Sequence, residues 1–256
     1  MRKRQKYVIS SAILSLGFIS VQVFNIDWRY QAIAGLSLLT MLLSIWSLFE
    51  GLGGIAWLMV LLLPPLYTAG VGLFYFLLPS SWLTRLPVAL AYSAGMYALL
   101  LTENIFTVAA VRTIQLFRSA HAVGFLLTLA TAFFLYDAIL SSKLPFWSNA
   151  LLVGICTFPL TLQGLWSVKL NDKITKGLLV FSGIISLLLL EVAGVISFWP
   201  LTVTSGSLFL TACLYVVLGL CQHYLDERLF PNTVREYLGV GTVVLLTMYF
   251  TTQWGG

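Results

Sequence analysis

Long apolar runs, joined by short polar segments, follow one another along the whole chain. A helix that crosses about 30 Å of hydrocarbon needs roughly 17 to 25 apolar residues, and these runs approach or reach that length. They are continuous, whereas the strands of a transmembrane barrel alternate apolar and polar positions over about ten residues. We predict membrane-spanning helices at residues 7–24, 30–48, 55–78, 86–101, 120–140, 147–167, 174–198, 201–222 and 237–251.

Prolines predict where several of these helices bend or end. Pro200 leaves barely a turn between the seventh and eighth runs, while Pro64 and Pro65 lie midway through the third and Pro159 lies inside the sixth. Each proline removes a backbone hydrogen bond and should kink or break its helix. Such a break can expose carbonyl groups to a solute or an ion, or it can only shape packing.

The basic residues predict the orientation of the bundle. Cytoplasmic loops carry an excess of Lys and Arg, and the rule applies best to short loops. With the amino terminus in the cytoplasm, the inside set is Arg2, Lys3, Arg4, Lys6, Arg112, Arg118, Lys169, Lys173, Lys176, Arg228 and Arg235. The outside set is Arg29, Arg85 and Lys143. Dropping or adding one helix scrambles this partition. We therefore predict nine spans, with the amino terminus cytoplasmic and the carboxyl terminus outside.

Composition favours a membrane protein over a soluble one. Of the 256 residues, 59% are hydrophobic and 9% are charged, and the mean hydropathy is +0.96. Soluble domains carry about 25% charged residues. We predict an all-α fold, a polytopic transmembrane helical bundle that forms a single integral membrane domain over residues 1–256. The net charge of +5 then reflects topology, and we expect no nucleic-acid partner.

One polar segment interrupts the apolar pattern, TENIFTVAAVRTIQLFRSAH at residues 102–121. At about 100° per residue, its apolar and polar side chains gather on different sides of a helix. The apolar face holds Ile105, Ala109, Thr113, Leu116, Phe117 and Ala120. The polar face holds Asn104, Thr107, Gln115, Arg118 and Ser119, with Arg112 at the border. We predict an amphipathic helix at residues 102–119 that lies in the cytoplasmic interface of the membrane.

Two interpretations of this segment stay open. In the first, it is a connector whose arginines anchor to anionic lipid head groups, with Glu103 as an ion-pair partner of Arg112 or Arg118. In the second, it is a binding site. Arg112 and Arg118 would then hold a phosphate, because guanidinium groups bind phosphate bidentately. Glu103, Asn104 and His121 would orient a head group or exchange protons with it.

Glu191, in ISLLLLEVAGV, is the only acid that the predicted map places well inside a span. Carboxylates at such depth are costly and usually face a bundle interior or a cavity. Glu191 is therefore either part of a proton-coupled carrier or a structural residue that meets Thr202, Thr204 or Ser205. The binding candidates are Glu103, Asn104, Arg112, Gln115, Arg118, His121 and Glu191.

Cysteines, histidines and missing motifs restrict the chemistry. Cys156, Cys213 and Cys221 fall in or at the end of apolar runs without metal-ligand spacing, so we expect free thiols that pack as small apolar groups. His121 and His223 fall at cytoplasmic helix ends, where interface histidines are commoner than haem ligands. Motifs of metalloproteases and nucleotide-binding loops do not occur. We expect no metal and no cofactor.

The run NIFTVAAVRTIQLFRSAHAVGFLLTLATAFF, together with REYLGVG before the last span, resembles uncharacterised bacterial multi-pass membrane proteins of unknown function. The resemblance implies a location in the cell (inner) membrane and no particular activity. From the residues themselves, we rank first the binding or transport of a small or lipidic solute. A non-catalytic membrane scaffold comes second, and an enzyme acting on a lipid-linked substrate at the cytoplasmic face comes third.

Overall fold

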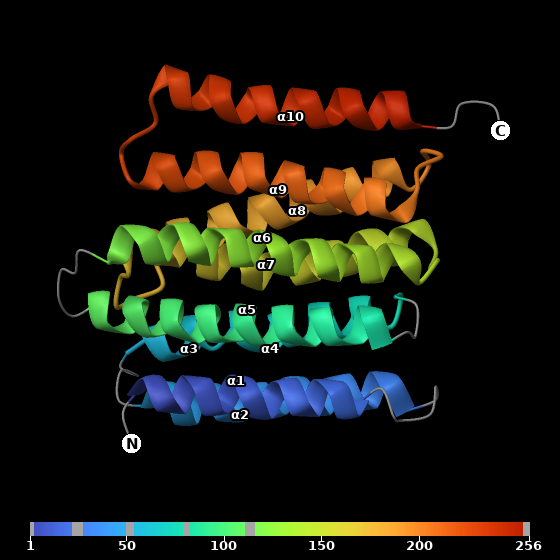
Figure 1. Ribbon diagram of the computed structural model, residues 1–256. Coiled ribbons are helices and arrows are strands. Elements are labelled where there is room, and N and C mark those ends of the chain that lie inside the picture. Colours follow the sequence, from blue (N-terminus) through green and yellow to red (C-terminus); the bar gives the residue numbers. More distant parts are fainter. Residues whose placement is uncertain (1–2, 22–27, 50–53, 79–81, 111–115, 253–256) are drawn as a thin grey trace. The chain divides into compact units, whose positions relative to one another are not determined.

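The computed structural model describes residues 3–21, 28–49, 54–78, 82–110 and 116–252, with the backbone alone for 82–85. These residues are almost entirely helical, and the chain divides into two compact units that share one helix (Figure 1). Unit 1 comprises Met1–Thr131 with Leu170–Lys173, and unit 2 comprises Ala132–Lys169 with Ile174–Gly256.

Unit 1 is built around aromatic and hydroxyl side chains. Its helices are α1 (Lys3–Val21), α2 (Arg29–Leu48), α3 (Ala56–Val60), α4 (Leu63–Tyr75), α5 (Trp82–Ala109) and the first part of α6 (Phe117–Ser141). Helix α1 packs against α2 and α5, and α2 packs against α4. The ring of Phe18 stacks on that of Tyr92 at 4.7 Å, and the Thr68 hydroxyl lies 2.9 Å from both the Tyr92 and the Thr40 oxygens. The hydroxyl groups of Thr40, Thr68 and Tyr92 are thus paired with one another.

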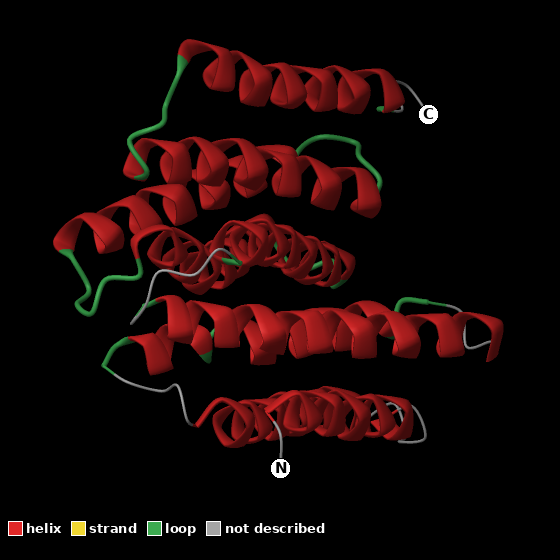
Figure 2. Cartoon of the chain, turned by 60° about the vertical axis from the view of Figure 1, so that its left-hand side comes forward, coloured by secondary structure: helices red, strands yellow, loops and turns green. Residues whose placement is uncertain are grey.

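Unit 2 contains the rest of α6 with α7 (Phe146–Lys169), α8 (Lys176–Ile196), α9 (Val203–Leu225) and α10 (Pro231–Thr251). Helix α8 packs against α7 and α9, and α10 packs beside α9, as Figures 1 and 2 both show. The side chains of Thr175 and Thr202 cap α8 and α9 by accepting from backbone N–H groups of the first turn. Such caps satisfy donors that a helix start leaves without an intrahelical partner.

The apolar runs are helices, as predicted. Among the described residues, seven helices are long and apolar enough to cross a membrane: α2, α3 and α4 together, α5 from Leu86, α6, α7, α8 and α9. Helix α1 begins with Lys3 and Arg4, and α10 carries Arg235 and Glu236 just after its first turn; these two helices fall outside that set. The chain is therefore an all-α protein with the composition of a membrane protein.

The structure corrects the predicted interfacial helix. Residues 102–109 continue α5 instead of forming a separate surface helix, and α6 begins at Phe117. The reason is spacing, because Leu99, Glu103 and Phe106 follow one another at intervals of three or four residues and are all buried. A polar residue within such a stripe does not interrupt it. The segment between the two helices, residues 111–115, lies outside the described residues.

The prolines behave in two ways. The third predicted run is divided at Leu61 and Leu62, immediately before Pro64 and Pro65, which confirms a break there. Proline in the first turn of α4 removes an N–H that would have no intrahelical partner in any case. Pro159, in contrast, lies inside an uninterrupted α7, so no break occurs at that position. Neighbouring groups in transmembrane helices commonly compensate for a missing N–H.

Candidate functional site

Helices α9 and α10 touch closely near the start of α10. The ring of Tyr237 occupies the space where a side chain at Gly219 would begin, and it also contacts the rings of Tyr215 at 4.9 Å and His223 at 5.6 Å. Glycine leaves room for an aromatic ring against the neighbouring backbone, as small residues do at helix interfaces in membranes. This aromatic group closes the space between α9 and α10 at one end.

A second attachment joins the opposite end of α10 to the loop before α9. The indole Nε1–H of Trp199 donates to the hydroxyl of Thr252 at 3.0 Å. The Thr252 hydroxyl in turn donates to the carbonyl of Met248 at 2.7 Å, and both Thr252 and Met248 are buried. Helix α10 is thus attached to its neighbours at both ends.

Between these attachments lies an open groove of about 590 Å³. Its lining is Ser205, Leu208, Thr211, Ala212 and Tyr215 from α9, with Val240, Val244, Thr247, Met248 and Thr251 from α10. The described lining contains apolar and hydroxyl side chains and no charged side chain. The volume falls within the range of small-molecule sites, roughly 300 to 1,000 Å³. We call this space the α9–α10 groove.

The hydroxyl groups of the groove are oriented by their own helices. Thr211 donates to the carbonyl of Ser207 at 2.8 Å, and Thr247 donates to that of Val243 at 2.8 Å. Thr251 does the same toward Thr247 at 2.9 Å. The hydroxyl protons of these three threonines are therefore engaged. Each of the three oxygens keeps lone pairs that can accept a hydrogen bond from an occupant of the groove.

A buried carboxylate lies on the other side of α9, and the sequence analysis did not single it out. Asp137 of α6 is 4% exposed, and its Oδ1 accepts from the Ser207 hydroxyl at 2.9 Å. The neighbouring Tyr136 hydroxyl lies 2.7 Å from the Thr157 oxygen of α7. These contacts join α6 to α7 and α9. Asp137 interrupts the apolar run FFLYDAIL, and that interruption was the available signal.

The residues of the polar segment lie in two different environments. Glu103 is fully buried in α5, Asn104 is half-buried, and Arg118 is exposed in the first turn of α6. His121 is half-buried, and its ring contacts that of Phe117 at 6.1 Å. Arg112 and Gln115 lie outside the described residues.

Aromatic contacts bring the two sides of this segment together. The rings of Phe106 and Phe117 are 6.1 Å apart, and Gly124 of α6 faces Phe106 and Thr102 of α5. Helices α5 and α6 therefore cross close to Glu103 and His121. The aromatic rings and the close approach of Gly124 to Phe106 fit a packed helix junction.

Glu191 does not line the interior of unit 2. It is exposed on α8, in a stripe with Val180, Ile184, Leu187 and Val195, all of which are exposed apolar residues. These positions recur every three or four residues and therefore share one helix face. The Thr202 hydroxyl donates to that of Ser205 at 2.8 Å, and the described residues show no hydrogen bond from Thr202, Thr204 or Ser205 to Glu191. The exposure of Glu191 gives no support to a path through the interior of unit 2.

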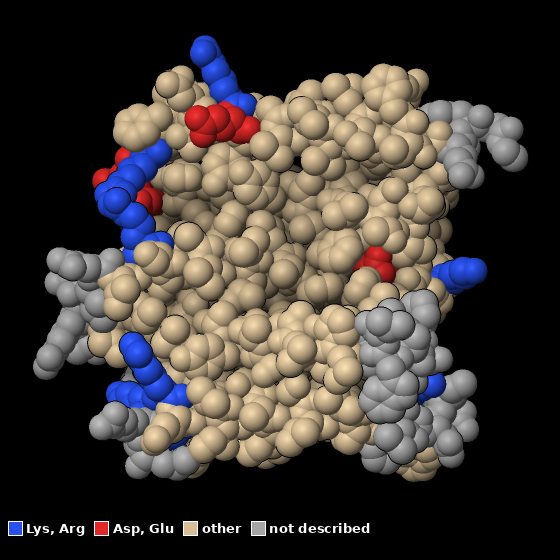
Figure 3. Space-filling view, viewed as in Figure 1, with Lys and Arg blue, Asp and Glu red and all other residues tan. Residues whose placement is uncertain are grey.

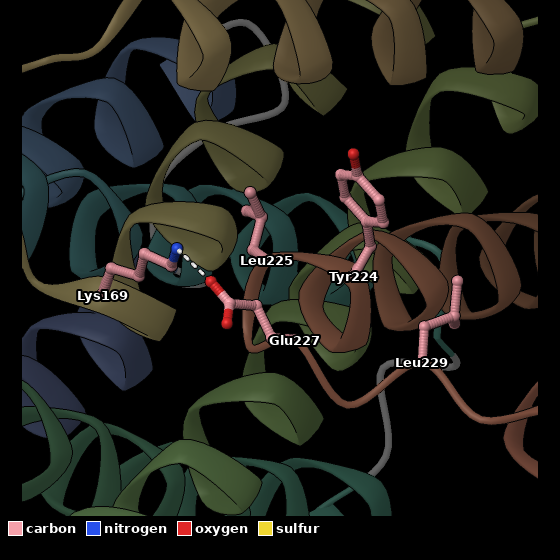
Figure 4. Close-up of a pocket in the computed structure, with 5 residues that line it drawn as sticks. All are labelled: Lys169, Tyr224, Leu225, Glu227 and Leu229. Atoms are coloured by element: carbon pink, nitrogen blue, oxygen red, sulfur yellow. Dashed lines mark ion pairs between the residues drawn. The ribbon is translucent and has the colours of Figure 1, made fainter.

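A second, more polar pocket of about 540 Å³ lies where α7 ends and α9 leads into α10 (Figure 4). Lys169 and Glu227 approach to 4.0 Å across it, beside Tyr224, Leu225 and Leu229. Both charged side chains are largely exposed, and exposed ion pairs contribute little to stability. In Figure 3, charged side chains gather at this end of unit 2, while the length of its helices is mostly apolar.

The cysteines are free and half-buried, in agreement with the prediction of free thiols. Cys156 and Cys213 lie near Tyr136 in unit 2. Their surroundings are apolar helix faces, where a thiol packs as a small hydrophobic group.

Comparison with known protein families gives one match. Residues 46–251 match a family described as "Protein of unknown function (DUF5656)", and this range includes both walls of the α9–α10 groove. No curated protein and no solved structure matches the chain.

Proposed function

The chain belongs to this family, and we propose that it is an integral membrane protein that binds or transports a lipidic solute in the α9–α10 groove. The observation that carries the proposal is the groove itself, an apolar space of about 590 Å³ between α9 and α10, which the Tyr237–Gly219 contact bounds on one side and the Trp199–Thr252 bond on the other. Acyl chains fill apolar spaces between helices because burying apolar surface away from water is favourable. Opening sideways between two helices, the groove suits a molecule that arrives from the bilayer.

Our proposed topology has nine spans, with α3 and α4 forming one of them. Within unit 2, Lys169, Lys176, Arg228 and Arg235 lie at one end of the helices, and Lys143 lies at the other. This asymmetry supports a cytoplasmic location for the first group, and so a cytoplasmic amino terminus and an external carboxyl terminus. We further propose a single membrane domain over residues 1–256 in the cell (inner) membrane.

Anionic lipid head groups are the partners that we propose for Arg112 and Arg118. The exposure of Arg118 in the first turn of α6 supports this assignment, since a guanidinium group there can reach lipid phosphates. Binding to vesicles with and without an anionic lipid, compared between the wild type and Arg112→Ala/Arg118→Ala, tests it. Equal binding by the two proteins would remove it.

A groove-filling substitution tests the lipid-binding proposal. Ala212 lines the groove, and Ala212→Phe should occupy it without removing a hydrogen bond. Ala34→Phe is the matched control, because Ala34 is exposed on α2 in unit 1. Native mass spectrometry of protein released from mild detergent should show a lipid adduct on the wild type and on Ala34→Phe. The adduct should be lost from Ala212→Phe.

Equal adducts on all three proteins, or none on any, would contradict the groove as a binding site. The alternative is then a membrane scaffold, which the exposed apolar stripe of α8 supports. Scaffolds of this kind expose apolar faces to partner helices and need no cavity. A lipid-active enzyme requires that the polar groups of residues 103–121 converge on one point.

A further inference from the structure

We infer that the solute of the α9–α10 groove is an uncharged lipidic alcohol whose hydroxyl lies at the end formed by Ser205 and Thr251. The inference rests on the proposed function and narrows it to one class of ligand. It concerns the charge of the head group, its position and its hydrogen-bonding character, and each follows from a different feature of the groove.

The charge follows from the lining. All ten described lining residues are apolar or carry a hydroxyl group. Moving a carboxylate, phosphate or ammonium group into such a space is strongly unfavourable unless an opposite charge pairs with it. The nearest charged part of α10 is Arg235 and Glu236, which lie beyond Tyr237 and outside the lining. An uncharged head group is therefore favoured.

The position follows from the closure of the groove at one end. Tyr237 lies against Gly219 and Tyr215, so the space between the helices ends there in aromatic rings. At the other end, Ser205 of α9 and Thr251 of α10 both line the opening. An alkyl chain that extends toward Tyr215 places its polar head near these two hydroxyl groups.

The hydrogen-bonding character follows from the protons of the threonines. The hydroxyls of Thr211, Thr247 and Thr251 donate to backbone carbonyls of their own helices. Toward the groove they offer oxygen lone pairs, which pair with a donor on the ligand. Ser205 accepts from Thr202 at 2.8 Å, which leaves its own proton to donate to a ligand oxygen. An alcohol hydroxyl both donates and accepts, whereas an ether or an ester only accepts.

Four photoactivatable probes with one alkyl chain test the inference: a primary alcohol, its methyl ether, the carboxylate and the trimethylammonium salt. Full-length protein in lipid vesicles is irradiated with each probe, and the labelled peptides are identified by mass spectrometry. The alcohol should label α9 and α10 about tenfold more than the ether, since one hydrogen bond in an apolar site corresponds to about that factor. The two charged probes should label the groove least.

A pair of variants assigns the preference to the threonine oxygens. Thr247→Val/Thr251→Val keeps the shape of the groove and removes two hydrogen-bond acceptors. The yield of labelling by the alcohol should therefore fall to the yield that the ether gives. Thr242→Val is the control, because Thr242 makes the same bond within α10, to Leu238, but does not line the groove. It should keep the preference of the wild type.

The outcomes separate the two proposals. Labelling of the groove by all four probes alike would overturn the inference and leave lipid binding in place. Stronger labelling by a charged probe would overturn it as well. If no probe labels α9 or α10, the proposed function itself fails.

Discussion

The two antiparallel helix pairs of unit 2, α7 with α8 and α9 with α10, are packed differently. In the first pair, Gly154 lies against Leu190, and Gly194 faces Ala150 at 3.8 Å from the position of a Cβ. In the second pair, Gly219 receives Tyr237 and Gly241 faces Val216 at 3.1 Å from the position of a Cβ, but beyond these contacts the interface opens into the α9–α10 groove. Small residues along an interface let two helices approach closely, and the α9–α10 interface is open beyond the last of its glycine contacts.

Breaking the tight pair should have the largest effect. A side chain at Gly154 would begin 3.0–3.1 Å from atoms of Leu190, including its Cβ, which cannot move independently of α8. Gly154→Leu should lower the free energy of unfolding by about 2–3 kcal/mol, the range of overpacked cores. Denaturant-induced unfolding in mixed micelles measures this change in the free energy of unfolding. Gly183→Leu is the control on α8, since nothing lies within 4 Å of a Cβ there, and equal losses from the two variants would contradict the close contact at Gly154.

Removing the bond between α6 and α9 should have the next largest effect. Ser207→Ala leaves the buried Asp137 carboxylate without the donor that it has in the structure. The loss should be about 1–2 kcal/mol in the free energy of unfolding, as for other buried polar groups that lose a partner.

Ser186→Ala is the matched control for this change. Ser186 is also buried, but its hydroxyl donates at 2.8 Å to Ser182 of its own helix. Ser186→Ala should therefore lower the free energy of unfolding clearly less than Ser207→Ala does. A loss as large as that of Ser207→Ala would show that burial of the serine, and not the bond to Asp137, is what matters.

The looser pair can be opened further at the end where Trp199 bonds to Thr252. Trp199→Phe keeps an aromatic ring and removes the N–H that donates to Thr252. The global loss should be about 0.6 kcal/mol, the average for such bonds in membrane proteins. Hydrogen exchange in the last turn of α10 should nevertheless rise several-fold, because that end is then held less firmly. Trp147→Phe, on the exposed start of α7, should leave exchange in α10 unchanged.

The sequence was sufficient for the helices and insufficient for the site. The predicted run 174–198 corresponds to α8 at Lys176–Ile196, because uninterrupted apolar residues of that length have few alternatives to a helix. Residues 102–109 belong to α5 and not to a surface helix, because Glu103 lies in one stripe with the buried Leu99 and Phe106. The groove could not be predicted, because it depends on where Tyr237 meets Gly219 on a different helix.

Glu191 provides the smallest expected effect and a test of the exposed face of α8. Its neighbours Ile184, Leu187 and Val195 are 55–65% exposed, so the carboxylate lies on an apolar surface outside the α7–α8 interface. Glu191→Leu removes a group that is unfavourable in hydrocarbon and breaks no bond that the described residues show. The free energy of unfolding should change by less than about 0.5 kcal/mol, and lipid adducts should persist. A large loss of either would mean that this face of α8 has a polar partner in the membrane, and the scaffold alternative would then replace the lipid-binding proposal.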